Sequence, residues 1–132
     1  EKQPERAIPL FKKAAEAGNS DGQFRLAYAY HFGQGVAVDK AQAARLYTLA
    51  ASKGHSMARN NLGVLFRDGA GVAMDKAEAW ALFDLAAKNG NDLASSNRDK
   101  LSPSLTPEQL TEARQRQGHW IIKSASTSSP TP

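Results

Sequence analysis

The sequence contains no cysteine, which excludes disulfide bonds and thiolate metal sites. Its uninterrupted apolar runs span only a few residues, whereas a membrane-spanning helix needs about 20, so we predict no membrane insertion. No methionine and no signal peptide precede Glu1, and we interpret the chain as a processed fragment whose targeting information is missing. The lack of cysteine does not assign a compartment, because exported bacterial proteins often lack it too.

A concentrated basic patch is also missing from the sequence. The net charge is +4, but the lysines and arginines are scattered and most have an acidic neighbour. The densest group consists of Arg98, Lys100, Arg114 and Arg116, with Asp99, Glu108 and Glu112 among them. Nucleic-acid-binding domains usually gather positive charge in a patch or stripe. We therefore predict a solvated, mildly basic surface and no nucleic-acid partner.

What the sequence does contain is an internal repeat. Residues 18–53 and 54–89 align without gaps and are identical at fifteen of 36 positions. Residues 1–17 match the second half of this unit, and residues 90–123 continue it in a degenerate form that closes as a cap. A single unit of this kind cannot bury its apolar face alone, so units stack and share a core. We predict one solenoid over residues 1–123 and a disordered tail over residues 124–132.

The first helix of each unit is predicted over Ser20–Phe32 and Ser56–Arg67. The serine that opens each segment is an N-cap candidate, because its hydroxyl can accept a backbone N–H. Gly33 and Gly69 suit the left-handed conformation that ends many helices.

The second helix of each unit follows a GQGVAVD or GAGVAMD loop and is predicted to run to about Lys53 and Asn89. Asp39 and Asp75 are its predicted N-caps, and the Gln or Glu three residues later completes a capping box. The loop glycines allow a tight turn in which the valine of each loop reaches the core. In the first half-unit, Pro9 predicts either a helix start or a kink.

The C-terminal unit is predicted to begin with a helix over residues 91–101, which stops near Pro103. Thr106, Pro107 and Gln109 carry the signature of a second helix start. The apolar face predicted for this last helix consists of Leu110, Ala113, Trp120 and Ile121.

The repeated positions resemble the Sel-one-like repeat (SLR), a longer relative of the tetratricopeptide repeat (TPR). The resemblance implies an all-α fold, a right-handed α/α superhelix whose concave face is made by the first helix of each unit. It also implies a protein-binding or scaffolding role in bacteria, often outside the cytoplasm. A cysteine-rich branch of the family is associated with β-lactam binding, and we do not transfer that activity to a chain without cysteine. The resemblance rests on Leu26, Tyr30, Gly33, Gly35, Val36, Asp39, Tyr47, Ala50, Ala51 and Gly54, and on their counterparts from Leu62 to Gly90.

Catalytic and cofactor chemistry finds little support. The Gly-x-Gly loops follow a helix rather than a strand and lack the G-K-[ST] of a phosphate-binding loop. His31, His55 and His119 are far apart and lack metal-ligand spacing. No nucleophile elbow or Ser–His–Asp pattern is present. We predict that the protein is not an enzyme and needs no cofactor or metal.

The sharper hypothesis concerns the concave face, with its register set by analogy with the TPR. Aromatic side chains beside polar and basic ones suit an extended peptide or a partner helix. The alternative is that Phe24 and Tyr28 only pack against the next unit. The side chains predicted to line this groove are Asp21, Phe24, Tyr28, His31, Asn60, Val64, Arg67 and Lys100, with Met57, Leu93 and Ser96 in the same rows.

The predicted function is a protein–protein interaction scaffold that binds a peptide or partner segment, located in the periplasm or secreted. A second predicted surface is the exposed helix Pro9–Ala17, which could associate with another copy or with upstream repeats. Two alternatives stay open. One is a carbohydrate or cell-wall ligand stacked on Phe24 and Tyr28, and the other is a structural spacer.

Overall fold

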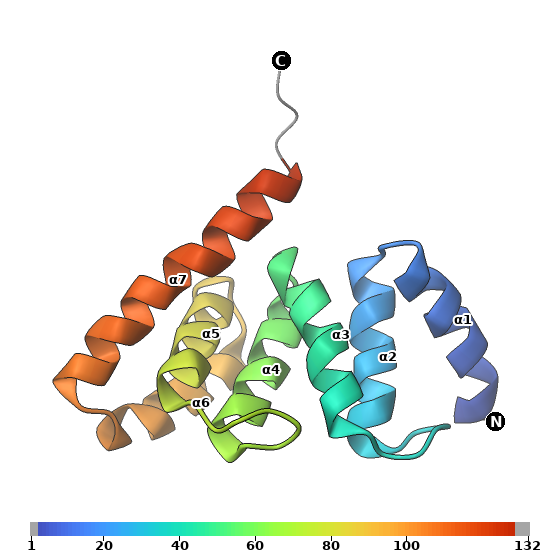
Figure 1. Ribbon diagram of the computed structural model, residues 1–132, viewed down its shortest axis with the longest axis horizontal. Helices are drawn as coiled ribbons and strands as arrows, with labels where there is room; N and C mark the ends of the chain where they lie inside the picture. Colours follow the sequence, from blue (N-terminus) through green and yellow to red (C-terminus); the bar gives the residue numbers. More distant parts are fainter. Residues whose placement is uncertain (1–2, 129–132) are drawn as a thin grey trace.

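The chain folds into helices that follow one another along the long axis of the molecule (Figure 1). The structure is a computed structural model that describes residues 3–128, with side chains described as far as residue 121. Within these residues there are seven α-helices and one short 3-10 helix. They are α1 (Pro4–Glu16), α2 (Ser20–Phe32), α3 (Lys40–Ser52), α4 (Ser56–Asp68), α5 (Lys76–Lys88), α6 (Asp92–Leu101), η1 (Ser102–Ser104) and α7 (Pro107–Ser128).

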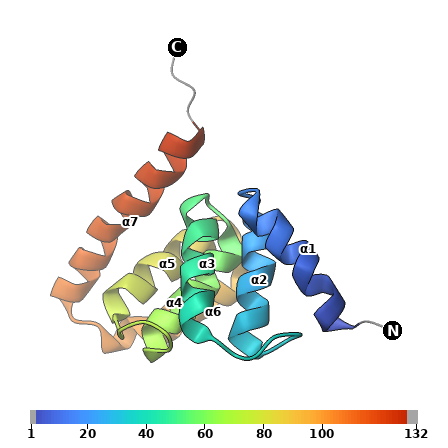
Figure 2. The ribbon, with the colours of Figure 1, turned by 45° about the vertical axis from the view of Figure 1, so that its right-hand side comes forward.

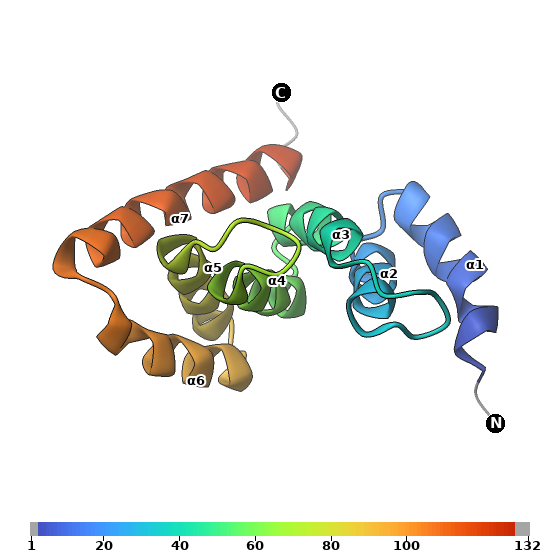
Figure 3. The ribbon, with the colours of Figure 1, turned by 60° about the horizontal axis from the view of Figure 1, so that its bottom comes forward.

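The helices repeat with the period found in the sequence. The second helices α1, α3 and α5 begin at Pro4, Lys40 and Lys76, and each has 13 residues. Each helix packs against the next one along the chain as far as α6, while α5 also contacts α7. Figure 3 shows α6 and α7 on opposite sides of α5, and Figure 2 shows α1 and α7 at opposite ends of the molecule. The prediction of an all-α solenoid of paired helices is confirmed.

The first helices begin with caps other than those predicted. The N-caps are Asn19 and His55, and the predicted serines are instead the first helical residues. Asn19 Oδ1 accepts the N–H of Gly22 at 2.7 Å, and His55 Nδ1 accepts the N–H of Ala58 at 3.1 Å. Positive-φ glycines precede both caps and leave Asn19 and His55 in the extended conformation that an N-cap requires. Gly33 and Gly69 end α2 and α4 in the left-handed region, as predicted.

The second helices have the predicted caps but only half of the predicted capping box. Asp39 and Asp75 each accept a backbone N–H from the residue three positions later at 3.0 Å. The reciprocal bonds do not form, because the N–H groups of Asp39 and Asp75 donate to the carbonyls of Tyr30 and Phe66 at 2.9 Å. The backbone N–H groups that a capping box would satisfy therefore bond to carbonyls at the end of the preceding helix. In α7 the box between Thr106 and Gln109 is complete.

The structure decides between the two alternatives at Pro9. α1 begins at Pro4, with Pro9 inside it, so the predicted start at Pro9 is wrong. A proline inside a helix forfeits one backbone hydrogen bond. Ile8 is buried in the larger of the two hydrophobic clusters, the main core cluster, which also contains Leu26, Leu46 and Leu62. This packing of α1 outweighs the loss of one backbone hydrogen bond at Pro9.

The last helix extends further than predicted. α7 continues to Ser128, although the tail from residue 124 onwards was predicted to be disordered. Serine, threonine and alanine tolerate a helix, and no proline interrupts the chain before Pro130. Residues 129–132 lie outside the described part of the chain. Ile121 is 53% exposed, so it does not share the buried face of Ala113 and Trp120 as predicted.

Small residues let neighbouring helices approach closely. Ala43, Ala50, Ala79 and Ala86 are fully buried. The loop valines pack against the main core cluster, as predicted. Gly71 lies so close to the start of α3 that a Cβ built on it would be 2.5 Å from the Lys40 carbonyl oxygen. A side chain at Gly71, or a side chain larger than methyl at these alanines, would push the neighbouring helices apart.

We predict that Gly71→Ala destabilises the protein much more than Gly90→Ala. Both glycines have positive φ, which costs an alanine about 1–2 kcal/mol. Only Gly71 has backbone within contact distance of a new Cβ, whereas nothing lies within 4 Å at Gly90. Urea denaturation should therefore show a loss for Gly71→Ala at least twice that for Gly90→Ala. Equal losses would mean that this close contact is unimportant.

Candidate functional site

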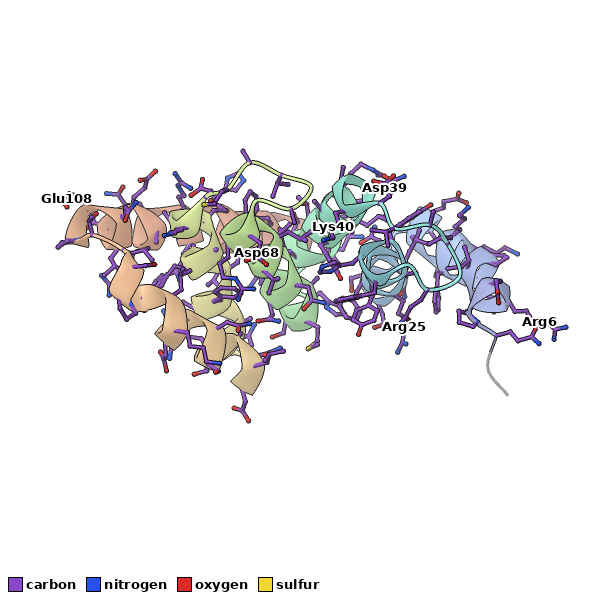
Figure 4. The ribbon with its side chains drawn as sticks, turned by 90° about the horizontal axis from the view of Figure 1, so that it is seen from below. Arg6, Arg25, Asp39, Lys40, Asp68 and Glu108 are labelled. Carbon is purple, nitrogen blue, oxygen red and sulfur yellow. The ribbon has the colours of Figure 1, made fainter. Side chains whose placement is uncertain are left out.

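An apolar cleft lies between α1 and α2, the first two helices of the described chain. This α1–α2 cleft has a volume of about 750 Å³ and is lined by Leu10 and Phe11 of α1, by Phe24 and Tyr28 of α2, and by Met57 of α4. Arg6 and Arg25 also line it, and Figure 4 shows both projecting from this end of the molecule. The cleft contains three of the predicted groove residues, Phe24, Tyr28 and Met57.

The internal repeat shows why this cleft is open. Leu10 is 69% exposed, whereas its counterparts Leu46 and Leu82 are 4% and 0% exposed. α2 packs against α3, which carries Leu46, and α4 packs against α5, which carries Leu82. Among the described residues no helix takes the corresponding place beside α1. The predicted second surface, the helix Pro9–Ala17, includes Leu10, and the 36-residue spacing of Leu10 from two buried leucines is the signal that singles it out.

The aromatic residues of α2 extend the site beyond the cleft. The rings of Tyr28 and Phe32 are 4.6 Å apart, and these two residues are 37% and 52% exposed. Phe24 is half-buried, and its ring stacks on His55 at 4.8 Å. Asp21 lies at the edge in an exposed ion pair with Arg25. The Phe32 ring in turn stacks on His31 at 4.1 Å, so Tyr28 is the ring of this surface that has no stacked partner among the ring contacts described.

The predicted groove residues of α4 and α6 have different environments. Asn60 is only 1% exposed, so its predicted place on the accessible groove is wrong. Val64 is half-buried and packs against the cluster that contains Phe83. Arg67 pairs with the adjacent Asp68, at 2.8 Å and 3.1 Å, and Lys100 is exposed.

Asn60 belongs to a chain of hydrogen bonds that crosses the solenoid. The Asn97 amide donates to Asn60 Oδ1 at 2.9 Å, and the Asn60 amide donates to Asn61 Oδ1 at 3.0 Å. The Asn61 amide donates to Tyr47 Oη at 3.2 Å, and Tyr47 Oη lies 3.0 Å from His31 Nδ1. This polar chain connects α6, α4, α3 and α2. Its buried amides are thereby satisfied, as a polar group in a core requires.

The polar chain ends at His31. Tyr47 Oη accepts from Asn61 and keeps its own proton available to donate to Nδ1 of a neutral His31. Burial lowers the pKa of His31, Lys40 lowers it further, and Asp68 opposes them. Figure 4 shows Lys40 at the start of α3 and Asp68 at the end of α4. Burial likewise raises the pKa of Tyr47, whose hydroxyl stays protonated.

Other kinds of site find no support in the described part of the chain. Within residues 3–128, no group of three His, Cys, Asp or Glu side chains is placed to hold a metal ion. None of the helices described there is long and apolar enough to cross a membrane. What remains is a surface of apolar and aromatic side chains with basic groups at its margin.

The fold and this surface define a repeat protein of the α/α-solenoid class. The Sel1 repeat model matches residues 1–19, 20–55 and 56–91, and the chain belongs to the Sel1 repeat (SLR) family. This family is a repeat scaffold, and no catalytic family is indicated.

Two solved bacterial structures show the same fold. A protective antigen of uropathogenic Escherichia coli strains, which displays an SLR fold, is 32% identical with a TM-score of 0.88, and the match covers 99% of this chain and 30% of that one. A Sel1 repeat protein from Oxalobacter formigenes is 26% identical with a TM-score of 0.72, covering 92% of this chain and 49% of that one. The chain thus spans half or less of the length of these relatives. No curated protein matches it.

We predict that the stability of the protein falls as the pH drops from about 7.5 to about 5.5. The lowered pKa of His31 means that the unfolded chain binds this proton more tightly than the folded one. The stabilisation is complete above the unfolded pKa of about 6.5 and is lost as the pH falls through it towards the folded pKa.

Denaturation midpoints measured across this range test the prediction, with His31→Gln as the comparison. The variant should be less stable at pH 7.5 and should show a flatter dependence on pH. A parent chain whose stability does not change over the range would contradict the assignment of a neutral His31.

Proposed function

We propose that this protein is an interaction scaffold that binds a helical segment of a partner protein in the α1–α2 cleft. The observation that carries the proposal is the exposure of Leu10, at a position that is buried by a helix in both following units. An apolar surface at a position that a helix covers in the following units suits a helical occupant, either a segment of a partner or a preceding repeat of the same protein. The partner would cover Leu10, Phe11 and Met57 and would contact Tyr28 at the rim.

The shape of the cleft favours a helix over an extended strand. Its walls are two packed helices, α1 and α2, and no sheet edge is available to pair with a strand within residues 3–128. Amphipathic helices bind such grooves through apolar residues at helical spacing. Arg6 and Arg25 at the margin favour acidic residues on the exposed face of the partner.

The remaining predicted groove residues would serve a longer partner. Such a segment would leave the cleft past Tyr28 and run over α4 and α6 towards Lys100. Contacts with Asp21, Val64 and Arg67 belong to this proposal, together with the exposed edge of His31. Asn60 does not, because it is buried in the polar chain.

A carbohydrate ligand is the weaker candidate. One face of the Phe24 ring already lies on His55, so Tyr28 is the ring that remains more accessible to a sugar, and a single ring is a weak platform for stacking. We also propose a location outside the cytoplasm, in the periplasm or secreted. Support comes from the relative that is described as a protective antigen, a property that favours accessibility to a host. The partner could be another protein or a second copy of this chain.

We predict that Leu10→Asp weakens binding of an amphipathic helix, whereas Ile121→Asp does not. Both side chains are exposed, at 69% and 53%, so neither change should unfold the protein. The probe is a fluorescent peptide of residues 19–33, which is the segment that packs against α3 in the intact unit. The charged side chain would be buried by the bound helix, which should weaken the affinity by about tenfold or more.

Fluorescence polarisation measures both variants and the parent chain, and sedimentation reports whether the chain itself dimerises. Loss of a dimer in Leu10→Asp alone would identify a second copy as the occupant. Failure of the parent chain to bind the peptide or to dimerise, or equal binding by both variants, would contradict the proposal.

A further inference from the structure

A second cleft lies between α1 and α3, over the side of α2 that faces away from the α1–α2 cleft. This α1–α3 cleft has a volume of about 470 Å³. Its apolar lining includes Leu26, Leu46 and Leu49, with Tyr30 and Gln42 beside them. We propose that it binds the indole ring of a tryptophan carried by a partner helix. The proposal does not depend on the α1–α2 cleft or on its ligand.

The evidence is an equivalent place, one repeat further along, that already holds an indole. Shifting the lining by 36 residues leads from Leu26, Leu46 and Leu49 to Leu62, Leu82 and Leu85. These three leucines and Trp120 belong to the same buried cluster. Trp120 of α7 is 4% exposed, and its Nε1 donates to Glu78 Oε2 at 2.7 Å.

The two places differ mainly in whether they are covered. Leu85 is 7% exposed, whereas its counterpart Leu49 is 42% exposed; Leu26 and Leu46, at 6% and 4%, form the floor of the cleft. α7 contacts both α5 and α3, so it covers the groove between them (Figures 1 and 3). Among the described residues no element covers the groove between α3 and α1. The α1–α3 cleft is therefore an open copy of the seat of Trp120.

The chemistry of the seat is retained in the open copy. Gln42 stands where Glu78 accepts the indole N–H, and its side-chain oxygen can accept one further hydrogen bond besides that from Arg45. Tyr30 replaces Phe66 and keeps an aromatic ring at the wall. A tryptophan side chain matches both features, because it combines a large apolar surface with a single donor.

The rim distinguishes the partner helix from α7 itself. Three residues before Trp120, the Gln117 amide donates to the Ala81 carbonyl and to Asp84. In the α1–α3 cleft, Arg45 and Thr48 occupy the positions that correspond to Ala81 and Asp84. A partner helix should therefore carry an acidic residue three positions before its tryptophan, facing Arg45. A second copy of α7 is not the occupant, because its Trp120 is already buried in its own chain.

The probe for this site is a synthetic peptide of residues 106–121 that carries Gln117→Glu. It keeps the complete capping box and the tryptophan, and its new carboxylate would be repelled by Asp84 at the original seat. The isotope-labelled protein is titrated with the peptide and followed by amide chemical shifts. We expect saturable changes at Leu26, Tyr30, Gln42 and Leu49. The same peptide with Trp120→Ala should bind about tenfold or more weakly.

Two protein variants complete the test. Ala15→Phe places a ring in the cleft and should prevent binding, provided that its circular dichroism matches that of the parent chain. Leu10→Asp, which alters only the other cleft, should bind the peptide as the parent does. The proposal is overturned if no saturable shifts occur, if they lie around Leu62 and Leu85, or if the Trp120→Ala peptide binds equally well. Loss of binding in Leu10→Asp would also overturn it.

Discussion

Close approach between helices at alanine and glycine is the constraint on which the rest of this structure depends. Ala43, Ala50, Ala79 and Ala86 are fully buried, and Gly71 lies against the backbone at the start of α3. With such small contacts the helices of adjacent units nearly touch, and leucine and aromatic side chains fill the layers between them. Because the same small residues recur every 36 positions, each unit is placed on the next in the same way. The two clefts lie where positions that are buried in one unit are exposed in an equivalent unit.

Across these apolar layers the polar chain supplies a directional connection. The amides of Asn97, Asn60 and Asn61 all donate the same way, towards Tyr47 and His31. Bonds that donate in one direction polarise one another, and an unsatisfied member in a core would be costly. The chain therefore favours one rotation of α4 relative to α3 and α6. It also explains why Asn60 and Asn61, which belong to this chain, serve packing rather than recognition.

The repeat provides an internal reference for reading function. Equivalent residues have the same local sequence, so a difference in their exposure reports what surrounds them. The exposures of Leu10 and Leu46 differ, as do those of Leu49 and Leu85. These differences identify two places where one unit has a covering element and the other has none within residues 3–128. α7 closes the solenoid at one end through Trp120 and the ion pairs of Arg116 with Asp75 and Glu78. The binding proposals concern the other end, where the same positions stay open.

The sequence by itself determined the repeat, the helix pairs and most helix ends, including the caps Asp39 and Asp75 and the terminal glycines Gly33 and Gly69. These features are local, because capping bonds and positive φ involve residues within one turn of one another. Only the tertiary structure decided that Asn60 is buried, that α1 runs through Pro9, and that Trp120 lies between two units. The side chain that a helix presents to solvent depends on its rotation against neighbours some 36 residues away in the chain. That rotation is set by long-range packing, which no local pattern encodes.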